Sequence, residues 1–253
     1  MNTLFKKPQI FAPYENLVAL QTTRHGGVSP EPFASLNLGT NTLDTPENVF
    51  RNRDILCSHL GITPSSLVTA DQKHGTKVLH AVAGGHYSGY DAFVTGRQDV
   101  FLCILTADCF PVLLFDPENE VSGAAHAGWK GTAANVAGIT IEAMKEKFGT
   151  SPSRCCAYIG TGISGSIYEV GQEVAACFGN KYHKPSPHGR MLLDLAAANL
   201  DQLLEAGIPR DCIEVSPFCT FRNNRDFFSY RKERGKTGRM TSLIGVSSVN
   251  RTP

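Results

Sequence analysis

The sequence lacks the patterns typical of membrane proteins and secreted proteins, and it contains no short metal-binding motif. Its longest apolar runs are broken by Asp, Gly or Pro well short of the width of a bilayer, so no transmembrane span is expected. Residues 1–8 have no apolar stretch after Lys6 and Lys7 and no small-residue cleavage site. No CxxC or HExxH pattern is present. We therefore expect a cytoplasmic protein without a membrane partner, and any metal site must combine residues from distant segments.

An excess of one charge is also lacking. The chain carries 24 Lys and Arg against 23 Asp and Glu, which gives a formal net charge of +1. This balance creates no overall field that would attract a nucleic acid, so no nucleic-acid partner is expected. One segment departs from the balance, because residues 222–239 hold seven Lys or Arg against two acids. We interpret this basic segment as a candidate anion site.

The cysteines do not suggest a disulfide framework. There are 8 in 253 residues, and most lie inside apolar strand or helix patterns, as buried free thiols do. The rest of the composition, 42% hydrophobic and 19% charged residues, is typical of a globular protein. No internal repeat, low-complexity tract or linker rich in Pro, Gly or Ser interrupts it. We predict a single domain covering residues 1–253.

Strand-like and helix-like patterns are mixed from one end of the chain to the other. Adjacent strand patterns in the middle break a regular alternation of strand and helix. The predicted fold class is therefore α+β, with mixed β-sheet layers packed against helices. The predicted strands are 17–23, 78–82, 100–105, 112–115, 121–125, 155–159, 213–215 and 243–246, and the predicted helices are 45–60, 132–148, 169–178 and 192–205.

Two polar motifs follow strongly apolar strands. Thr-Ala-Asp-Cys-Phe-Pro (106–111) follows the strand 100–105, and His-Ala-Gly-Trp-Lys-Gly (126–131) follows the strand 121–125. Together with Gln-Lys-His-Gly (72–75), these motifs provide His74, Cys109 and His126. One thiolate and two imidazoles suit a zinc ion that keeps an open coordination position. Such a site lowers the pKa of bound water, which is equipment for hydrolysis or deamination.

The residues by themselves leave other interpretations open. Cys109 could be a small buried hydrophobe, His126 a core histidine bonded to backbone, and His74 a loop residue. Alternatively, Cys109 could act as a thiolate nucleophile with His126 as its base, which would make the protein a cysteine hydrolase or amidase. The metal content of the protein separates this hypothesis from the zinc hypothesis.

A resemblance to a known family favours the metal. The chain resembles the YfiH family, also called the laccase-domain, polyphenol oxidase or multicopper oxidase-like group. The resemblance covers nearly the whole chain, in order. It rests on Thr22-Arg24-Gly26-Gly27, Ser35-Leu36-Asn37-Leu38-Gly39, Gln72-His74-Gly75, Asp91-Ala92, Thr106-Ala107-Asp108-Cys109-Pro111, His126-Ala127-Gly128-Trp129-Gly131, Tyr168-Glu169-Val170-Gly171, Phe228-Ser229-Tyr230-Arg231 and Thr237-Gly238-Arg239.

This resemblance implies a single α+β domain, a zinc ion held by His74, Cys109 and His126, and purine nucleoside chemistry. Members are described as phosphorylases for adenosine, inosine, guanosine and methylthioadenosine, and as adenosine deaminases. Bacterial relatives are linked to peptidoglycan editing, so a third hypothesis is a protein that binds or edits peptidoglycan precursors. The copper label fits less well, because the 8 histidines include no H-x-H pair. We treat copper in the same site as opportunistic.

Phosphorolysis requires positive charges that hold phosphate while the purine leaves. The candidate cations are Arg24, Lys130, Arg231 and Arg239, each of which could instead be a solvated surface charge. Lys130 stands where the family has Arg, which keeps the charge but gives up bidentate recognition of phosphate. Gly160-Thr161 stands where Gly-Pro is expected, which loosens that loop.

Deamination requires a carboxylate that moves protons. Asp108 and Asp91 are therefore catalytic candidates beside Cys109 and His126, although Asp91 could instead cap a turn and Asp108 could orient a histidine ligand. Two further substrate-binding candidates are Tyr168 and Asn37, the latter for ribose hydroxyls or merely as support for its loop. Trp129 suits the core as well as it suits a platform for the base.

Overall fold

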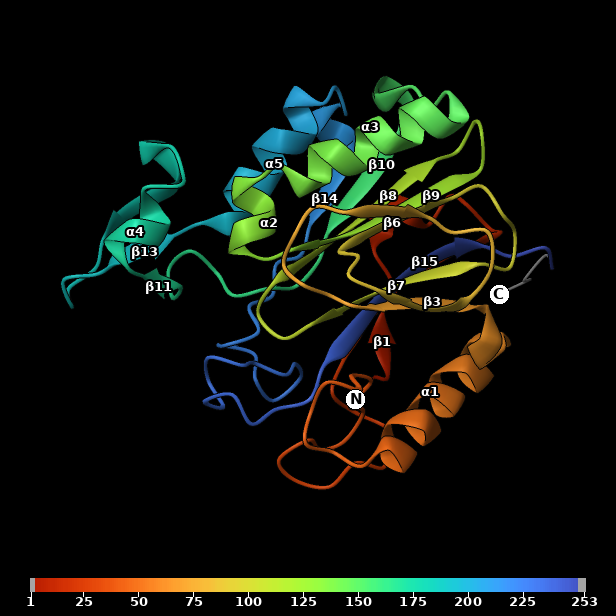
Figure 1. Cartoon of the computed structure of the whole chain (residues 1–253), viewed down its shortest axis with the longest axis horizontal. Helices are drawn as coiled ribbons and strands as arrows, with labels where there is room; N and C mark the ends of the chain where they lie inside the picture. Colours follow the sequence, from red (N-terminus) through yellow and green to blue (C-terminus); the bar gives the residue numbers. More distant parts are fainter. Residues whose placement is uncertain (1–2, 250–253) are drawn as a thin grey trace.

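Two six-stranded sheets form the centre of the computed structural model, which describes residues 3–249 (Figure 1). In spatial order, the first sheet contains β1 (Phe5–Lys6), β2 (Leu17–Thr22), β15 (Met240–Val246), β7 (Phe101–Thr106), β3 (Leu67–Asp71) and β5 (Gly85–Ser88). The second sheet contains β14 (Ile213–Val215), β10 (Cys156–Ile159), β8 (Phe110–Asp116), β9 (Val121–Ala127), β6 (Ala92–Thr95) and β4 (Val78–His80). Both sheets mix parallel and antiparallel pairs.

Helices cover the outer faces of the two sheets (Figure 1). Helix α1 (Pro46–Leu60) packs on the first sheet, while α3 (Val136–Phe148) and α5 (Leu195–Glu205) pack on the second, next to the short α2 (Trp129–Ala133). A third, small sheet of β11 (Glu169–Val170), β13 (Met191–Leu193) and β12 (His183–Pro185) extends to one side with α4 (Gln172–Ala175). Single 3-10 turns lie at Gln9–Phe11, Pro64–Ser66, Pro152–Arg154, Asn180–Tyr182 and Arg210–Cys212.

The apolar core follows this layering. Leu102, Ile104 and Ile244 of the first sheet meet Leu113 and Phe115 of the second between the two sheets. The opposite face of each sheet packs on its helices. Each fully buried side chain of this size stabilises the fold by roughly 1.5–3 kcal/mol. The α+β class with mixed sheet layers is therefore confirmed, and the same layers fix the strand ends from which the polar motifs project.

Helix α1 confirms the prediction for residues 45–60. Thr45 caps it by accepting a hydrogen bond from the backbone N–H of Asn48, Pro46 occupies its first turn, and Gly61 ends it with a φ of 59°. The predicted strands in both central sheets are also present, with no end shifted by more than three residues and 213–215 matched at both ends. Four strands of these sheets, β1, β3, β5 and β6, were not predicted.

The predicted helix at 132–148 is wrong at its start, because it is split in two. Asn135 adopts the left-handed conformation, with a φ of 60°, between α2 and α3. Its side chain accepts a hydrogen bond from the backbone N–H of Gly138 and so caps α3. Asn tolerates this conformation better than most residues. Asn135 can therefore act as an N-cap and begin a new helix, although the apolar pattern continues across it.

The predicted helix at 169–178 is also wrong. Residues Glu169–Val170 pair with β13, and only Gln172–Ala175 form a helix. Residues 192–193, predicted as helical, belong to β13, and α5 begins after Asp194, which accepts a hydrogen bond from the backbone N–H of Ala197. Pairing between distant segments outweighs helix propensity here, because each short strand satisfies its backbone only against its neighbours.

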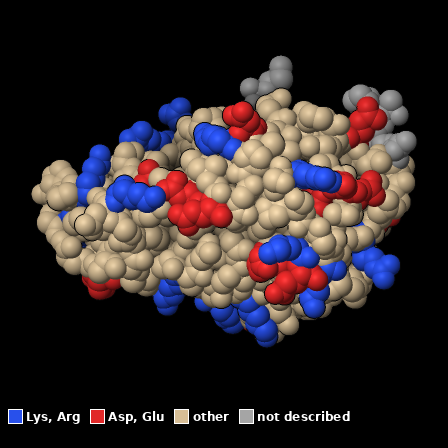
Figure 2. Space-filling view, turned by 90° about the horizontal axis from the view of Figure 1, so that it is seen from above, with Lys and Arg blue, Asp and Glu red and all other residues tan. Residues whose placement is uncertain are grey.

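All eight cysteines are free, as the apolar patterns around them predicted. None of the helices within residues 3–249 combines the length and apolar character that a membrane crossing needs. On the face shown in Figure 2, Lys and Arg side chains and Asp and Glu side chains both occur in small groups among other residues. This mixture accords with the small net charge of the sequence.

Candidate active site

A cavity of about 510 Å³ lies where the strands of the two central sheets run out into loops. Its walls come from segments far apart in the sequence: residues 39–41, 70–74, 105–109, 126–129, 168, 230–231 and 239. The volume is that of an ordinary small-molecule site. All three predicted metal ligands are in its wall.

His74, Cys109 and His126 converge in this cavity. Their side-chain ligand atoms all lie within 4.8 Å of one another, which is a separation that one bound ion can bridge. His126 belongs to β9, Cys109 lies in the tight connection between β7 and β8, and His74 follows β3 with a φ of 61°. The β8–β9 pairing places Pro111 opposite His126, so it fixes the thiol next to this imidazole. The sequence prediction that these three residues share one site agrees with their placement.

A carboxylate behind the cavity holds two of these ligands. Asp91 is 1% exposed and accepts hydrogen bonds from the backbone N–H groups of Lys73, His74 and Gly75. The same carboxylate accepts a fourth bond, of 2.9 Å, from Nδ1 of His126. Because that bond occupies Nδ1, the other ring nitrogen, Nε2, remains available as a metal ligand. Asp91 thus orients ligands from behind and does not line the cavity.

The electrostatics of this group favour charged forms. Burial would raise the pKa of the Asp91 carboxyl, but its hydrogen bonds to His126 and to the 73–75 backbone outweigh burial and hold that pKa below its ordinary value. Burial would likewise raise the pKa of Cys109, but the two imidazoles beside the thiol lower it. Near neutral pH this environment favours the thiolate, which is the form that binds a metal.

The backbone around the ligands is fitted closely. A Cβ atom added to Gly128 would lie 2.9 Å from Sγ of Cys109 and 3.0 Å from Cδ2 of His74. Any other residue there would push these two ligands away from each other. The glycine, the three donors and the Asp91 support therefore fit a metal ion that prefers sulfur and nitrogen, as zinc does.

The carboxylate of Asp108, the residue before Cys109, accepts hydrogen bonds from residues near the C-terminus. One carboxylate oxygen accepts hydrogen bonds from the hydroxyls of Thr220 and Ser229, at 2.6 and 2.7 Å, and the other accepts from the backbone N–H of Arg231 at 2.7 Å. The residue has a φ of 94° and lines the cavity. Its carboxylate therefore ties the basic segment 222–239 to the loop that carries Cys109.

Two cations of that basic segment line the cavity. Arg231 lies over the ring of Tyr168 at 5.3 Å, and Arg239 lies over the ring of Tyr230 at 5.6 Å. Nη1 of Arg231 donates to the carbonyl of Glu169, and Nη1 of Arg239 donates to the carbonyls of Thr237 and Gly238. Stacking leaves the other N–H groups of each guanidinium as possible donors to an anion. Tyr230 also lines the cavity; it belongs to the motif Phe228-Ser229-Tyr230-Arg231 but was not among the predicted site residues.

Three substrate-binding candidates lie outside the cavity wall. Lys130 is exposed on α2, with Nζ 5.6 Å from the ring of Trp129, because the helix turns its side chain outward. Asn37 is fully buried, and its Oδ1 accepts hydrogen bonds from the backbone N–H groups of Gly39 and Arg239. Asn37 therefore positions the backbone of Arg239 rather than facing the cavity.

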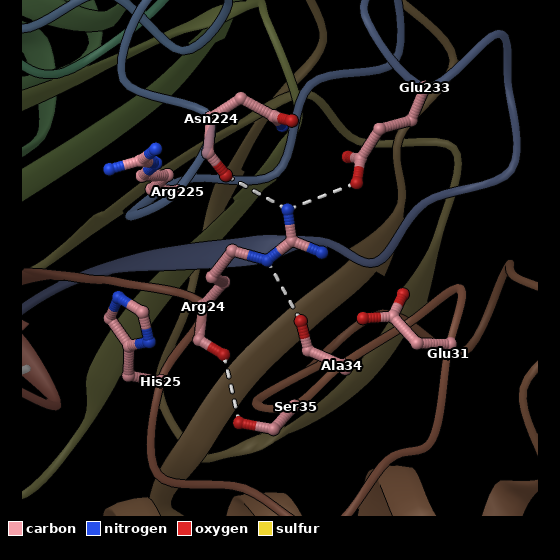
Figure 3. A pocket seen from close by; sticks show the side chains of 8 residues that line it. All are labelled: Arg24, His25, Glu31, Ala34, Ser35, Asn224, Arg225 and Glu233. Atoms are coloured by element: carbon pink, nitrogen blue, oxygen red, sulfur yellow. Dashed lines mark hydrogen bonds and ion pairs between the residues drawn. The ribbon is translucent and has the colours of Figure 1, made fainter.

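The third candidate, Arg24, lies in a separate surface pocket lined by Arg24, His25, Glu31, Ala34, Ser35, Asn224, Arg225 and Glu233 (Figure 3). Its guanidinium donates to the carbonyls of Ala34 and Asn224 and forms a 3.0 Å ion pair with Glu233. It also lies over the ring of Phe228 at 4.6 Å. Arg24 thus links the N-terminal loops to the basic segment. Its guanidinium bonds to protein groups outside the active-site cavity, so it does not act as a phosphate ligand there.

The sheet layers and the His-Cys-His group together define a β-rich protein whose cavity between strand ends holds a group of possible metal ligands. Residues 18–247 match the model of the family described as multi-copper polyphenol oxidoreductase laccase. The chain belongs to this family, whose relatives include the proteins called YfiH and YlmD.

Three relatives illustrate the similarity. The chain is 43% identical to a purine nucleoside phosphorylase of Deinococcus radiodurans over 246 residues, which cover 96% of this chain and 92% of that protein. It is 35% identical to the purine nucleoside phosphorylase YfiH of Escherichia coli over 237 residues, which cover 91% and 94% of the two chains. The crystal structure of YlmD from Geobacillus stearothermophilus matches with a TM-score of 0.92, 32% identity and 98% coverage of both chains.

Replacing Cys109 with Ala should abolish metal binding, because two imidazoles alone leave the site without its thiolate. The measurement is the zinc content of the purified variant after dialysis against limiting zinc. The matched control is Cys177→Ala, since Cys177 is an exposed free thiol outside the cavity. A Cys109→Ala protein that keeps one equivalent of zinc would show that this thiol is not a ligand.

Replacing Asp91 with Asn should weaken zinc binding by about 10–100-fold, because an amide cannot accept four hydrogen bonds and the support behind His126 is lost. A competition titration with a coloured chelator measures this change. Asp71→Asn is the control, since Asp71 also accepts a backbone hydrogen bond, from Gly89, but contacts no histidine. Equal zinc affinity in both variants would contradict the orienting role of Asp91.

Replacing Arg24 with Ala should lower the free energy of unfolding by about 1–3 kcal/mol, because Glu233 and two carbonyls lose a buried donor. Urea unfolding measures the change. Arg225→Ala removes an equal charge from the same pocket, and Arg225 is exposed, so it should leave stability nearly unchanged. If both variants unfold at the same urea concentration, Arg24 is only a surface charge.

Proposed function

We propose that the protein is a zinc-dependent purine nucleoside phosphorylase. The observation that carries the proposal is one cavity that combines a His-Cys-His donor group with two arginines and several aromatic rings. The names of the relatives, purine nucleoside phosphorylase, point to the same chemistry. Nucleosides and inorganic phosphate are accordingly the proposed substrates.

Zinc is the proposed metal because a thiolate and two imidazoles match its preferred donors. Zinc bound to His74, Cys109 and His126 would supply Lewis-acid chemistry to an oxygen atom of the substrate or of water. Copper binds the same donor types, so its occasional presence in the site is compatible with the proposal. The described residues provide one His/Cys/acid group of this kind and so do not supply a multicopper cluster.

In phosphorolysis, a phosphate oxygen bonds to C1′ of the ribose while the bond from C1′ to the purine nitrogen breaks. The purine leaves with the electron pair and takes up a proton, and ribose 1-phosphate is the second product. Arg239 and Arg231 would neutralise phosphate and hold it close to C1′. The rings of Trp129, Tyr168 and Tyr230, all in the cavity wall, would stack on the purine.

The same wall supports a broad choice of purine. Gln72 lines the cavity, but its amide donates to the carbonyl of Leu105 and accepts from the N–H of Leu105, so both ends are occupied. Aromatic faces bind any purine, because stacking does not read the substituents at the edge of the base. We propose adenosine, inosine, guanosine and methylthioadenosine as substrates of one pocket.

Deamination of adenosine is the second proposed reaction. Water replaces the amino group at C6, so ammonia and inosine form and a carrier must move a proton to the leaving nitrogen. Among the described residues of the cavity wall, Asp108 is the one acid. Asp108 already accepts three hydrogen bonds, which stabilise its charged form and make it a poor proton carrier. We therefore expect deamination to be slower than phosphorolysis.

A specific observation favours one alternative. The thiol of Cys109 lies near the imidazole of His126, which is in turn hydrogen-bonded to Asp91. A cysteine hydrolase has the same spatial arrangement of a nucleophile, a base and an acid that orients the base. Such an enzyme would work without metal. If the protein turns over no nucleoside, the remaining alternative is that it binds or edits peptidoglycan precursors.

Incubating the zinc-loaded protein with adenosine should give adenine and ribose 1-phosphate when phosphate is present, and slow formation of inosine when it is absent. Chromatography of the products measures both. A chelator should stop turnover, and zinc should restore it, because both reactions need the metal. Activity that survives complete removal of the metal would favour the cysteine hydrolase, and no turnover of any nucleoside would contradict the phosphorylase.

A further inference from the structure

Three cysteines gather at one edge of the second sheet, outside the candidate active site. Cys155 precedes β10, Cys156 begins it, and Cys212 is the residue before β14. All three are free thiols, and none of them lines the cavity of the metal ligands. The metal site and the substrate cavity therefore give this cluster no role.

The strand register places Cys156 opposite Cys212. Strands β10 and β14 run parallel with Ala157 opposite Ile213, and the two cysteines are the residues immediately before this pair. Neighbouring strands lie about 4.8 Å apart. This spacing is within the Cα separation of about 4.4–6.8 Å that a disulfide bond spans. The two strands therefore bring their thiols to adjacent positions.

The side chains of the pair also interact. Burial, the charge of Cys156 and a side-chain hydrogen bond with Cys156 together raise the pKa of the Cys212 thiol. On its other side, Sγ of Cys156 lies 3.3 Å from the hydroxyl of Tyr14. This hydrogen bond and burial raise the pKa of Tyr14 to about 12, so Tyr14 keeps its proton and can donate it to the sulfur.

Cys155 is directed elsewhere, although it is adjacent to Cys156. It belongs to the apolar core that the second sheet shares with its helices, whereas Cys156 belongs to the core between the two sheets. Its Sγ donates to the carbonyl of Ser151 at 3.5 Å. Cys155 and Cys156 are 1% and 7% exposed, while Cys212 is half-buried. Cys212 is thus the thiol of this cluster that a molecule in solution reaches first.

The strand that follows Cys212 has little else to hold it. Strand β14 lies at the edge of its sheet and pairs with β10 at three positions. Glu214 adds one contact, because its carboxylate accepts the backbone N–H of Ile10 at 2.7 Å. A bond between Cys156 and Cys212 would join the two strands covalently. It would also close residues 156–212, which include α5 and the small third sheet, into one ring.

We propose that Cys156 and Cys212 form a reversible disulfide bond that fastens β14 to β10, with a small disulfide such as oxidised glutathione as the oxidant. The Cys212 thiolate attacks one sulfur of the small disulfide, whose S–S bond breaks and releases one thiol. The Cys156 thiolate then attacks the Cys212 sulfur, and the second small thiol leaves with the electron pair and takes up a proton. Two protein thiols are oxidised and one small disulfide is reduced to two thiols. This modification does not depend on the reaction in the cavity.

The test uses the zinc-loaded full chain with Cys177→Ala, which removes the exposed thiol and with it links between molecules. In this parent, Cys156→Ser and Cys212→Ser each remove one partner, and Cys155→Ser is the matched control, because it removes the adjacent buried thiol. Each protein is held in mixtures of reduced and oxidised glutathione until its thiol content is constant, since the raised pKa of Cys212 slows exchange. Mass spectrometry identifies linked peptides, and scanning calorimetry gives the melting temperature.

The parent should lose two thiols per chain and give a link between its tryptic peptides 155–181 and 211–222. Its melting temperature should rise by about 5–10 °C, because the ring lowers the entropy of the unfolded chain. Cys155→Ser should behave in the same way. Cys156→Ser should instead retain one glutathione on Cys212, and Cys212→Ser should form no internal link. A reducing agent should reverse all of these changes.

Three results would overturn the proposal. The first is a parent in which no ratio of oxidised to reduced glutathione links the two peptides. The second is a link that survives in Cys156→Ser and is lost in Cys155→Ser, which assigns the bond to Cys155. The third is a linked protein that melts no higher than the reduced one, since β14 is then not fastened. If a serine variant does not fold, fragmentation of the linked peptides from the parent still identifies the bonded sulfurs.

Discussion

The site depends on one buried carboxylate. Asp91 collects three backbone N–H groups of residues 73–75 and Nδ1 of His126, while its own carbonyl accepts the backbone N–H of His126. Without this acceptor the loop of His74 would carry three unpaired donors next to the cavity and would lose its hydrogen-bonded link to His126 of β9. The separation of the metal ligands is therefore set by hydrogen bonds that lie behind them, which is how protein metal sites gain their rigidity.

A second set of anions supports the opposite wall. Asp108 holds the backbone of Arg231, and Glu233 bonds Arg24, the N–H of Ser229 and the hydroxyl of Thr237. Neither acid forms an ion pair with Arg231 or Arg239, although Asp108 and Cys109 lie near enough to Arg239 to act on its charge. The basic segment is thus held over the cavity by acids that bind its backbone and Arg24, while its two cavity arginines stay in the wall.

Much of the site followed from residue types at strand ends. The apolar strands on either side of Thr-Ala-Asp-Cys and before His-Ala-Gly-Trp indicated that both motifs emerge at strand ends, and the structure brings Cys109, His126 and His74 together. The roles of Arg24, Asn37 and Lys130 did not follow, because a charged or amide side chain has the same local pattern whether it binds a substrate, a backbone or water. The split helix at Asn135 and the small sheet around β13 were missed because a cap and a distant pairing outweigh local propensity.

By itself the sequence determined the fold class, the helix predicted at 45–60, the free thiols and the donor types available to a metal, since each depends on composition or on neighbours within a few residues. Only the tertiary structure decided which acid orients a ligand, which acid holds a loop and which arginines line the cavity. The reason is physical: hydrogen-bond partners and burial depend on residues 200 or more positions away, as in the bonds from Arg24 to Asn224 and Glu233, and no local pattern encodes that distance.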